Sequence, residues 1–160
     1  MRIIDIVAGT TVDGPGLRTS VYMAGCLHNC PGCHNPQTHD PAGGIEMSVD
    51  EVIAVIEENG FDVTLTGGDP LFPAEATAEL ARRLKEKGYG VWCYTGYLYE
   101  QAVSDPRLAK AIDHIDVLVD GPFRLEERDT TLRFRGSRNQ RLVDLRRSSP
   151  GEVSLYEDGY

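Results

Sequence analysis

Segments with the composition of β-strands alternate with amphipathic segments along most of this chain. Residues 17–24, which are rich in Thr, Val and Tyr, predict a first strand. After a long loop rich in Gly, Pro and His, Ser48 and Glu51 form the capping box that is typical of a helix start. Gly60 stands where such a helix ends, since glycine readily adopts the left-handed conformation of a helix C-cap. The pattern therefore predicts a strand over residues 17–24, a loop after it and a helix over residues 48–60.

The same alternation continues to about residue 119. Further strands are predicted over 61–66, 89–95, 115–119 and 141–145, and further helices over 74–87 and 98–111, the second interrupted near Pro106. Strands that alternate with helices favour a parallel sheet. Four such units are too few to close an eight-stranded barrel. An open, partial (β/α) barrel and a doubly wound sheet are the two architectures that this α/β pattern allows.

The length and composition are those of a single globular domain. The chain has 160 residues, of which 41% are hydrophobic and 26% are charged. We expect one domain over residues 1–147 and an acidic C-terminal tail, prone to disorder, over residues 148–160. No apolar run approaches the roughly 20 residues that span a bilayer, and the N-terminus lacks the apolar core of a signal peptide. These features predict a cytoplasmic protein with no membrane partner.

The distribution of charge narrows the classes of partner. A net charge of −9 argues against nucleic-acid binding, which requires a basic surface. The charge is uneven, however, because residues 124–147 hold eight arginines and only four acidic residues. This stretch is either an ordinary solvated face or a docking patch for an acidic partner or an anionic ligand.

The most unusual sequences in the chain all follow predicted strands directly. A cysteine-rich loop follows the first strand, and GGDP at 67–70 follows the second. YTGY at 94–97 covers the end of the third strand, and DGPF at 120–123 follows the fourth. Ligands of parallel β/α folds bind at the carboxyl ends of the strands. We therefore expect these four segments to form one site.

The cysteine-rich loop has the spacing of a metal site. Cys26, Cys30 and Cys33 form a C-x3-C-x2-C motif, and thiolates select iron–sulfur clusters, zinc or Cu(I). A [4Fe–4S] cluster normally takes four cysteines, so three ligands would leave one iron open to chemistry. The distant Cys93 is expected to be a small buried apolar residue. In the alternative reading, His28 or His34 completes a structural zinc site in a binding module without catalysis.

Several motifs together resemble the glycyl-radical-activating enzymes of the radical SAM superfamily. The resemblance rests on the cysteine motif with CPGCHN, on DGPGLRT at 13–19 and on TGGDPL at 66–71. GGDP, TGY, VDGPF and RGSRNQ at 135–140 are most similar to the activating proteins of the anaerobic ribonucleoside-triphosphate reductase. An activator of another glycyl-radical enzyme, such as pyruvate formate-lyase, is the alternative. The fold implied by this resemblance is an open partial (β/α) barrel of the radical SAM type, with parallel strands and helices on the outside.

The resemblance also implies roles for individual residues. The three cysteines would bind a [4Fe–4S] cluster whose fourth iron is chelated by S-adenosyl-L-methionine. No residue beyond the cluster and cofactor is implied to be catalytic. The implied partners are the large glycyl-radical subunit of the reductase and a one-electron donor such as a flavodoxin. The motifs at 13–18 and 135–140 would face the glycine loop or seal the site. The residues implied to bind the cofactor are Gly32, Cys33, His34, Gly67, Gly68, Asp69 and Thr95.

Overall fold

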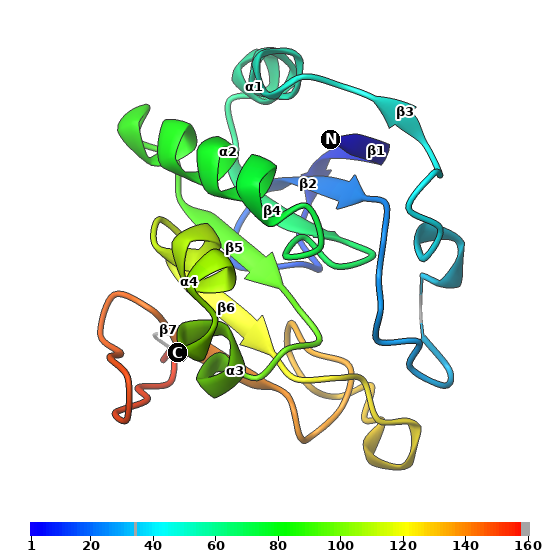
Figure 1. Cartoon of the computed structure of the whole chain (residues 1–160), viewed down its shortest axis with the longest axis vertical. Coiled ribbons are helices and arrows are strands. Elements are labelled where there is room, and N and C mark those ends of the chain that lie inside the picture. Colours follow the sequence, from blue (N-terminus) through cyan, green and yellow to red (C-terminus); the bar gives the residue numbers. More distant parts are fainter. Residues whose placement is uncertain (34, 158–160) are drawn as a thin grey trace.

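A computed structural model describes residues 1–33 and 35–157 of the chain, and it contains one seven-stranded sheet (Figure 1). The strand order across this sheet is β3-β1-β2-β4-β5-β6-β7. The strands are β1 (Arg2–Thr10), β2 (Arg18–Met23), β3 (Ile45–Glu46), β4 (Asp62–Gly67), β5 (Val91–Tyr94), β6 (Val117–Asp120) and β7 (Arg141–Asp144). The α-helices are α1 (Val49–Asn59), α2 (Ala74–Glu86), α3 (Tyr99–Ser104) and α4 (Pro106–Ile112), and two short 3-10 helices are η1 (Pro36–Thr38) and η2 (Leu125–Glu127).

The centre of the sheet is parallel and its edges are antiparallel. Strands β2, β4, β5 and β6 are neighbours and run in the same direction. Strand β1 pairs antiparallel with both β2 and β3, and β7 pairs antiparallel with β6. The prediction of a mixed α/β fold with a largely parallel sheet alternating with helices is therefore confirmed. Because the four central strands are parallel, their carboxyl ends lie along one edge.

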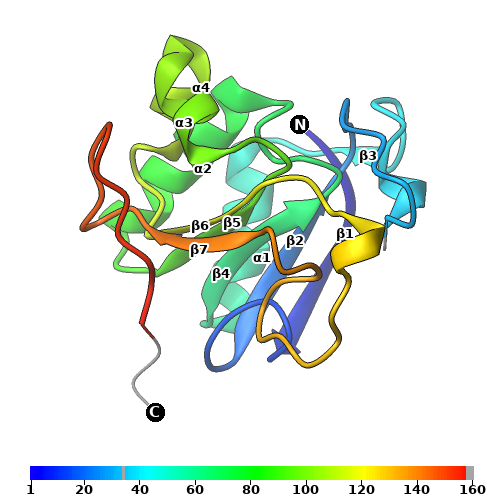
Figure 2. The same cartoon turned by 90° about the horizontal axis from the view of Figure 1, so that it is seen from below.

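Side chains on β5 alternate between two hydrophobic layers. Val91 and Cys93 point into the main core on the helix side, where both are fully buried. Trp92 and Tyr94 point to the opposite face, where Trp92 packs edge-on against Phe134 at a centroid distance of 5.4 Å. Figure 2 shows α2, α3 and α4 on one side of the sheet and residues 122–140 on the other. Loops, rather than helices, thus cover the second face.

The capping predictions for the first helix are confirmed in detail. The hydroxyl of Ser48 accepts from the backbone N–H of Glu51 at 3.1 Å, and the Glu51 carboxylate accepts from the N–H of Ser48 at the same distance. Gly60 ends the helix with φ of 76°, a left-handed conformation that glycine adopts without strain. Replacing such an N-cap typically costs about 1 kcal/mol. The predicted break at Pro106 is also present, between α3 and α4.

Strand β1 was not predicted, and its irregular pairing explains why. The register between β1 and β2 shifts between Ile3 and Asp5 and again between Val7 and Thr10. These shifts break the period-two pattern from which a strand is recognised. Only Ile3 is fully buried within β1. The strand nevertheless separates the two-residue β3 from the parallel strands.

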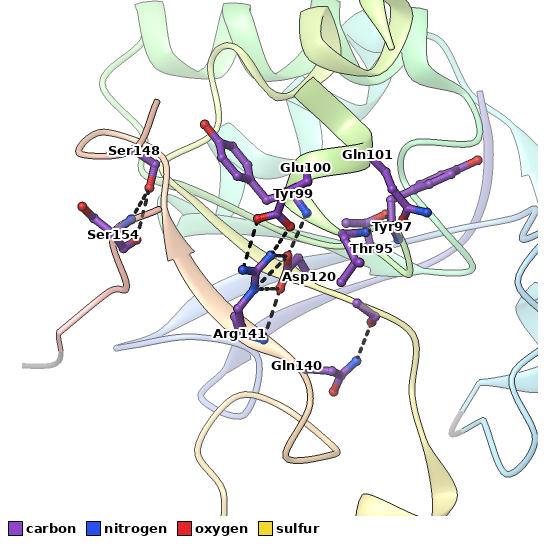
Figure 3. Close-up of polar contacts among 12 residues, drawn as sticks. Thr95, Tyr97, Tyr99, Glu100, Gln101, Asp120, Gln140, Arg141, Ser148 and Ser154 are labelled. Atoms are coloured by element: carbon purple, nitrogen blue, oxygen red, sulfur yellow. Dashed lines mark hydrogen bonds and ion pairs between the residues drawn. The ribbon is translucent and has the colours of Figure 1, made fainter. Parts of the chain in front are cut away.

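The last described residues pack against the sheet. Leu155 forms an antiparallel bridge with Val143, and the ring of Tyr156 lies edge-on to Trp92 at 5.0 Å between centroids. The Ser148 hydroxyl donates to the backbone carbonyl of Ser154 and accepts from the backbone N–H of the same residue (Figure 3). Within the described residues, no helix has the length and apolar character that crossing a membrane requires.

Candidate cofactor site at the strand ends

A cavity of about 190 Å³ lies at the carboxyl ends of the parallel strands. Residues from all four of the unusual strand-end segments contribute to its wall, as the sequence predicts. The segment at 11–17 and the closing loop at 135–140 complete it. The lining residues are Asp13, Cys26, His28, Cys30, Cys33, Asn35, Thr66, Gly67, Gly68, Tyr94, Thr95, Gly96, Gly121, Phe123, Gly136 and Gln140.

The cysteine loop is held to the sheet by its own backbone. The N–H of Gly25 donates to Thr38 at 2.8 Å, and the N–H of Cys26 donates to His39 at 3.2 Å. These bonds join the two ends of the loop, so its middle must curve back over the strand ends. The N–H of Cys33 donates to Cys30 at 3.1 Å and makes a tight turn between those two residues. None of the three thiols forms a disulfide, and all three line the same cavity.

The environment of the thiols combines burial with nearby N–H groups. Burial raises the pKa of Cys26, and the backbone N–H groups of His28 and Asn29 partly oppose this rise. Burial likewise raises the pKa of Cys30, opposed by the backbone N–H of Phe123. Those N–H groups would stabilise bound thiolates, because hydrogen bonds favour the charged form of sulfur.

His39 contributes a further contact to the third cysteine. Its Nε2 lies 3.3 Å from Sγ of Cys33, and the backbone N–H of Asn35 donates to the same sulfur at 3.4 Å. Hydrogen bonds to ligand sulfurs tune the potentials of iron–sulfur clusters. His39 is not among the site residues predicted from the sequence. Its spacing of six residues from Cys33 gave no helical or strand signal from which the contact could be foreseen.

The donor set fits a cluster better than a single ion. In residues 1–33 and 35–157, no three His, Cys, Asp or Glu side chains converge as ligands of one metal ion. In a cubane cluster each cysteine binds a different iron, so the thiols need only face one cavity, which they do. His28, the described candidate for a fourth zinc ligand, directs its Nε2 to Asp69 instead, at 2.7 Å.

Asp69 organises the junction of three of these segments. Its carboxylate is 1% exposed and accepts from the Thr95 hydroxyl at 2.8 Å and from the Gly96 N–H at 3.0 Å. It also accepts from the N–H of Leu71 and lies against His28. The ring of His28 further packs edge-on against Tyr97, with 4.6 Å between centroids. Because the carboxylate is committed to these donors beneath the cavity wall, Asp69 braces the site from within.

Gly67 and Gly68 line the cavity, and the chain's own packing explains why both are glycine. A Cβ on Gly67 would lie 2.4 Å from the backbone nitrogen of Met23, its partner across the β2–β4 ladder. A Cβ on Gly68 would lie 2.5 Å from the carbonyl oxygen of Gly25 and 2.8 Å from that of Thr38. The glycine pair therefore allows the cysteine loop to lie directly on the end of β4, and the binding of the cofactor by these two residues stays a prediction.

The DGPGLR segment divides between the cavity and the interior of the fold. Asp13 lines the cavity and accepts from Ser20 at 2.9 Å. Arg18, in contrast, is 3% exposed and donates to the Thr64 hydroxyl and to the Val63 carbonyl, each at 2.8 Å. Its guanidinium lies 5.6 Å from the ring centroid of Trp92, and burial lowers its pKa. Arg18 thus supports the sheet beneath the site.

The closing motif holds the loop that follows β6. The side-chain amide of Asn139 donates to the carbonyl of Pro122 at 2.7 Å. The side-chain amide of Gln140 donates to the carbonyl of Gly121 at 3.0 Å, a contact that Figure 3 shows. The side-chain oxygen Oε1 of Gln140 accepts from the backbone N–H of Gly136 at 2.9 Å. These three bonds give a structural reason for the RGSRNQ motif: it fixes one wall of the cavity.

An ion-pair network anchors the same wall to the sheet. Asp120, at the end of β6, is fully buried and accepts from the Tyr99 N–H at 2.8 Å and from the Arg141 guanidinium (Figure 3). Arg141 also donates to Glu100 at 2.7 Å. The bonds to Asp120, and then to Glu100, raise the pKa of Arg141.

Two other predicted positions have contrasting outcomes. His34, which the resemblance implies to bind the cofactor, falls outside the described residues. Cys93 is fully buried in β5, and burial raises its pKa well above the usual value. It is therefore the buried apolar residue that the sequence predicted.

Comparisons with known proteins agree with this arrangement. Residues 12–143, which include every residue lining the cavity, match a family described as a 4Fe-4S single cluster domain. The chain is also similar to proteins named anaerobic ribonucleoside-triphosphate reductase-activating protein. The protein of this name from Vibrio cholerae is 35% identical over 139 residues, 81% of this chain and 88% of the relative. The one from Escherichia coli is 33% identical, covering 84% and 93%, and the one from Haemophilus influenzae is 31% identical, covering 88% and 96%.

Proposed function

Because the chain belongs to the family of anaerobic ribonucleoside-triphosphate reductase-activating proteins, with a 4Fe-4S single cluster domain, we propose how its cavity serves that activity. The protein is an activating enzyme of the radical SAM type for the anaerobic ribonucleotide reductase. In our proposal it cleaves S-adenosyl-L-methionine reductively at a [4Fe–4S] cluster and places the radical on a glycine of the large reductase subunit. The single observation that carries this proposal is that Cys26, Cys30 and Cys33 all line one cavity.

The number of thiols supports a cluster with one open iron. The fourth cysteine, Cys93, is fully buried in β5 and belongs to the helix-side core. The cavity therefore offers three cysteine ligands from residues that the structure describes. When bound, the cluster and S-adenosyl-L-methionine supply the one-electron chemistry that removes a hydrogen atom from the glycine.

The chain's own part is to bind, orient and exclude water. We propose that Gly67 and Gly68 present backbone to the cofactor, with Gly32, His34 and Thr95 nearby. The Thr95 hydroxyl is committed to Asp69, so these two residues keep the wall in shape. The loop held by Gln140 closes the opposite wall. No acid or base is needed, since the abstracted hydrogen moves as an atom.

The wider arrangement of the protein follows from the same proposal. We propose that the sheet is the partial (β/α) barrel of the radical SAM type, formed within residues 1–147. Its parallel strands end at a site open enough for the loop of a large partner. The electron would come from a small one-electron donor such as a flavodoxin, and the protein would act in the cytoplasm.

Anaerobic reconstitution tests this proposal. Protein reconstituted with iron and sulfide is reduced with S-adenosyl-L-methionine, with and without the anaerobic reductase. Formation of 5′-deoxyadenosine and a glycyl-radical signal by electron spin resonance that depends on the reductase are expected. A radical formed only with pyruvate formate-lyase would contradict the choice of partner. Zinc without iron or sulfide in protein purified without oxygen would contradict the cluster itself.

A further inference from the structure

Two exposed leucines stand on loops that form the mouth of the cavity. Leu27 follows Cys26 directly and is 72% exposed. Leu125, in η2, is 50% exposed and lies against the cysteine loop, since a Cβ on Gly32 would be 2.9 Å from one of its methyl carbons. Figures 1 and 2 both show η2 beside the cysteine loop. Large apolar side chains that are exposed together at the mouth of a cavity are typical of a docking surface.

The loop that carries Leu125 is basic, in a protein that is acidic as a whole. Residues 124–138 contain five arginines and three acidic residues, whereas the whole chain has a net charge of −9. Arg128 is exposed and stands opposite Ser137 in an antiparallel bridge. Arg138 is also exposed, and in the sequence it lies between Gly136 and Gln140, which line the cavity. In the described part of the chain, neither Arg128 nor Arg138 forms an ion pair, so their charges are available to a partner.

The position of this surface decides what must cover it. A hydrogen atom can pass only between groups in contact, so the surface that carries the target glycine has to lie against the mouth of the cavity. Arginine is enriched at protein interfaces, and the buried centre of an interface is more apolar than its rim. Complementary charge at the edge of such an interface sets the rate and orientation of docking.

We propose that Leu27, Leu125, Arg128 and Arg138, here called the rim patch, are the surface on which the anaerobic reductase docks. The matching surface of the reductase has apolar side chains at its centre and carboxylates around them. This inference rests on the proposed function, because it takes the reductase to be the carrier of the glycine. It adds the residues that select this partner and the chemistry of the surface they select.

Binding of the reconstituted protein to immobilised reductase, measured without oxygen by biolayer interferometry, tests the rim patch. The double variant Arg128→Glu/Arg138→Glu and the single variant Leu125→Ser should each bind at least about tenfold more weakly than the wild type. Arg82→Glu, on the exposed side of α2, and Leu155→Ser, near the C-terminus, are matched controls that should bind normally. Raising the salt concentration should weaken the wild type more than the double variant, because screening removes charge attraction that only the wild type has.

The outcomes separate this inference from the proposed function. Wild-type affinity in the rim-patch variants, or equal losses in the controls, would overturn the rim patch and leave the function intact. A wild type that fails to bind the reductase at all would overturn both. Normal reductase binding with lost reduction by flavodoxin would assign the surface to the electron donor instead. The iron content and the unfolding curve of each variant, with Arg128→Ala/Arg138→Ala as a milder pair, show that a loss of binding is not a loss of structure.

Discussion

The imidazole of His28 lies 2.7 Å from the buried carboxylate of Asp69, and this contact joins the cysteine loop to the end of β4. The same carboxylate accepts from Thr95 and Gly96 at the end of β5. One side chain therefore sets the relative positions of three segments of the cofactor site. A Cβ on Gly96 would lie 2.5 Å from the His28 ring, so the backbone at this position leaves just enough room for the contact.

Replacing Asp69 should lower both the stability of the protein and its capacity to bind iron. Asp69→Ala leaves the buried groups of Thr95 and Gly96 without an acceptor, which should lower the free energy of unfolding by about 2–4 kcal/mol. Asp69→Asn, which keeps an acceptor oxygen, should lose roughly half as much. Urea unfolding measures both changes, and iron bound after reconstitution should fall in the same order. Asp62→Asn, at the other end of β4, is the control, and an equally large loss there would contradict the role given to Asp69.

The two classes of cysteine should respond differently to the same substitution. Cys30→Ala should abolish the cleavage of S-adenosyl-L-methionine and leave a folded chain, because its side chain faces the cavity. Cys93→Ala should retain cleavage and lower the free energy of unfolding by about 1 kcal/mol, since it removes one buried sulfur from the core. Detection of 5′-deoxyadenosine and thermal unfolding separate the two effects. Retained cleavage in Cys30→Ala would exclude it as an essential ligand.

Gly68→Ala should displace the cysteine loop. The added Cβ meets two backbone carbonyl oxygens, of Gly25 and Thr38, at 2.5 and 2.8 Å, and neither can rotate away as a side chain would. We expect a loss of about 1–3 kcal/mol in the free energy of unfolding and a large loss of bound iron. Gly90→Ala is the matched control, because its nearest neighbour is the side chain of Asp62 at 3.2 Å. Similar iron contents in the two variants would show that the loop accommodates the extra carbon.

The ion pair between Glu100 and Arg141 should give a small, pH-dependent contribution to stability. Hydrogen bonding from Arg141 lowers the pKa of Glu100 below its usual value of 4.5. The pair is therefore stabilising above pH 4.5, and its contribution is lost as the pH falls through the lowered pKa of the folded state. Since Glu100 is half exposed, Glu100→Gln should cost only about 0.5 kcal/mol at pH 7.

Urea unfolding at several pH values measures this dependence. The difference between Glu100→Gln and the wild type should narrow below pH 4.5 and should be largest near neutrality. Glu58→Gln is the control, because within the described residues the Glu58 side chain has no ion pair. A difference that stays constant from pH 7 to pH 3 would contradict the assignment.

The sequence could predict the parallel core and the location of the site. Ser48, Gly60 and Pro106 act through local backbone chemistry, and each has the effect that its residue type implies. The gathering of the cysteines with the glycine pair followed from a single rule, because parallel strands bring their carboxyl ends to one edge.

What the sequence could not predict depends on contacts between distant segments. The contact of His28 with Asp69 joins residues 41 positions apart, and no local pattern encodes it. The crowding around Gly67 and Gly68 could not be predicted for the same reason, since it comes from the backbone of β2 and its loop. Strand β1 was missed because its register shifts conceal the alternation of its side chains.

Phe134 and Tyr156 cover the second face of the sheet, and this determines when that part of the core can fold during synthesis. Both residues belong to the last fifth of the chain and leave the ribosome after all the parallel strands. Until then Trp92 lacks both of these aromatic partners, so its side of the core can be completed only after residue 156 has been synthesised. The cysteine loop emerges more than a hundred residues before the closing wall of its own cavity. During that interval the three thiols are accessible to whatever delivers iron and sulfide.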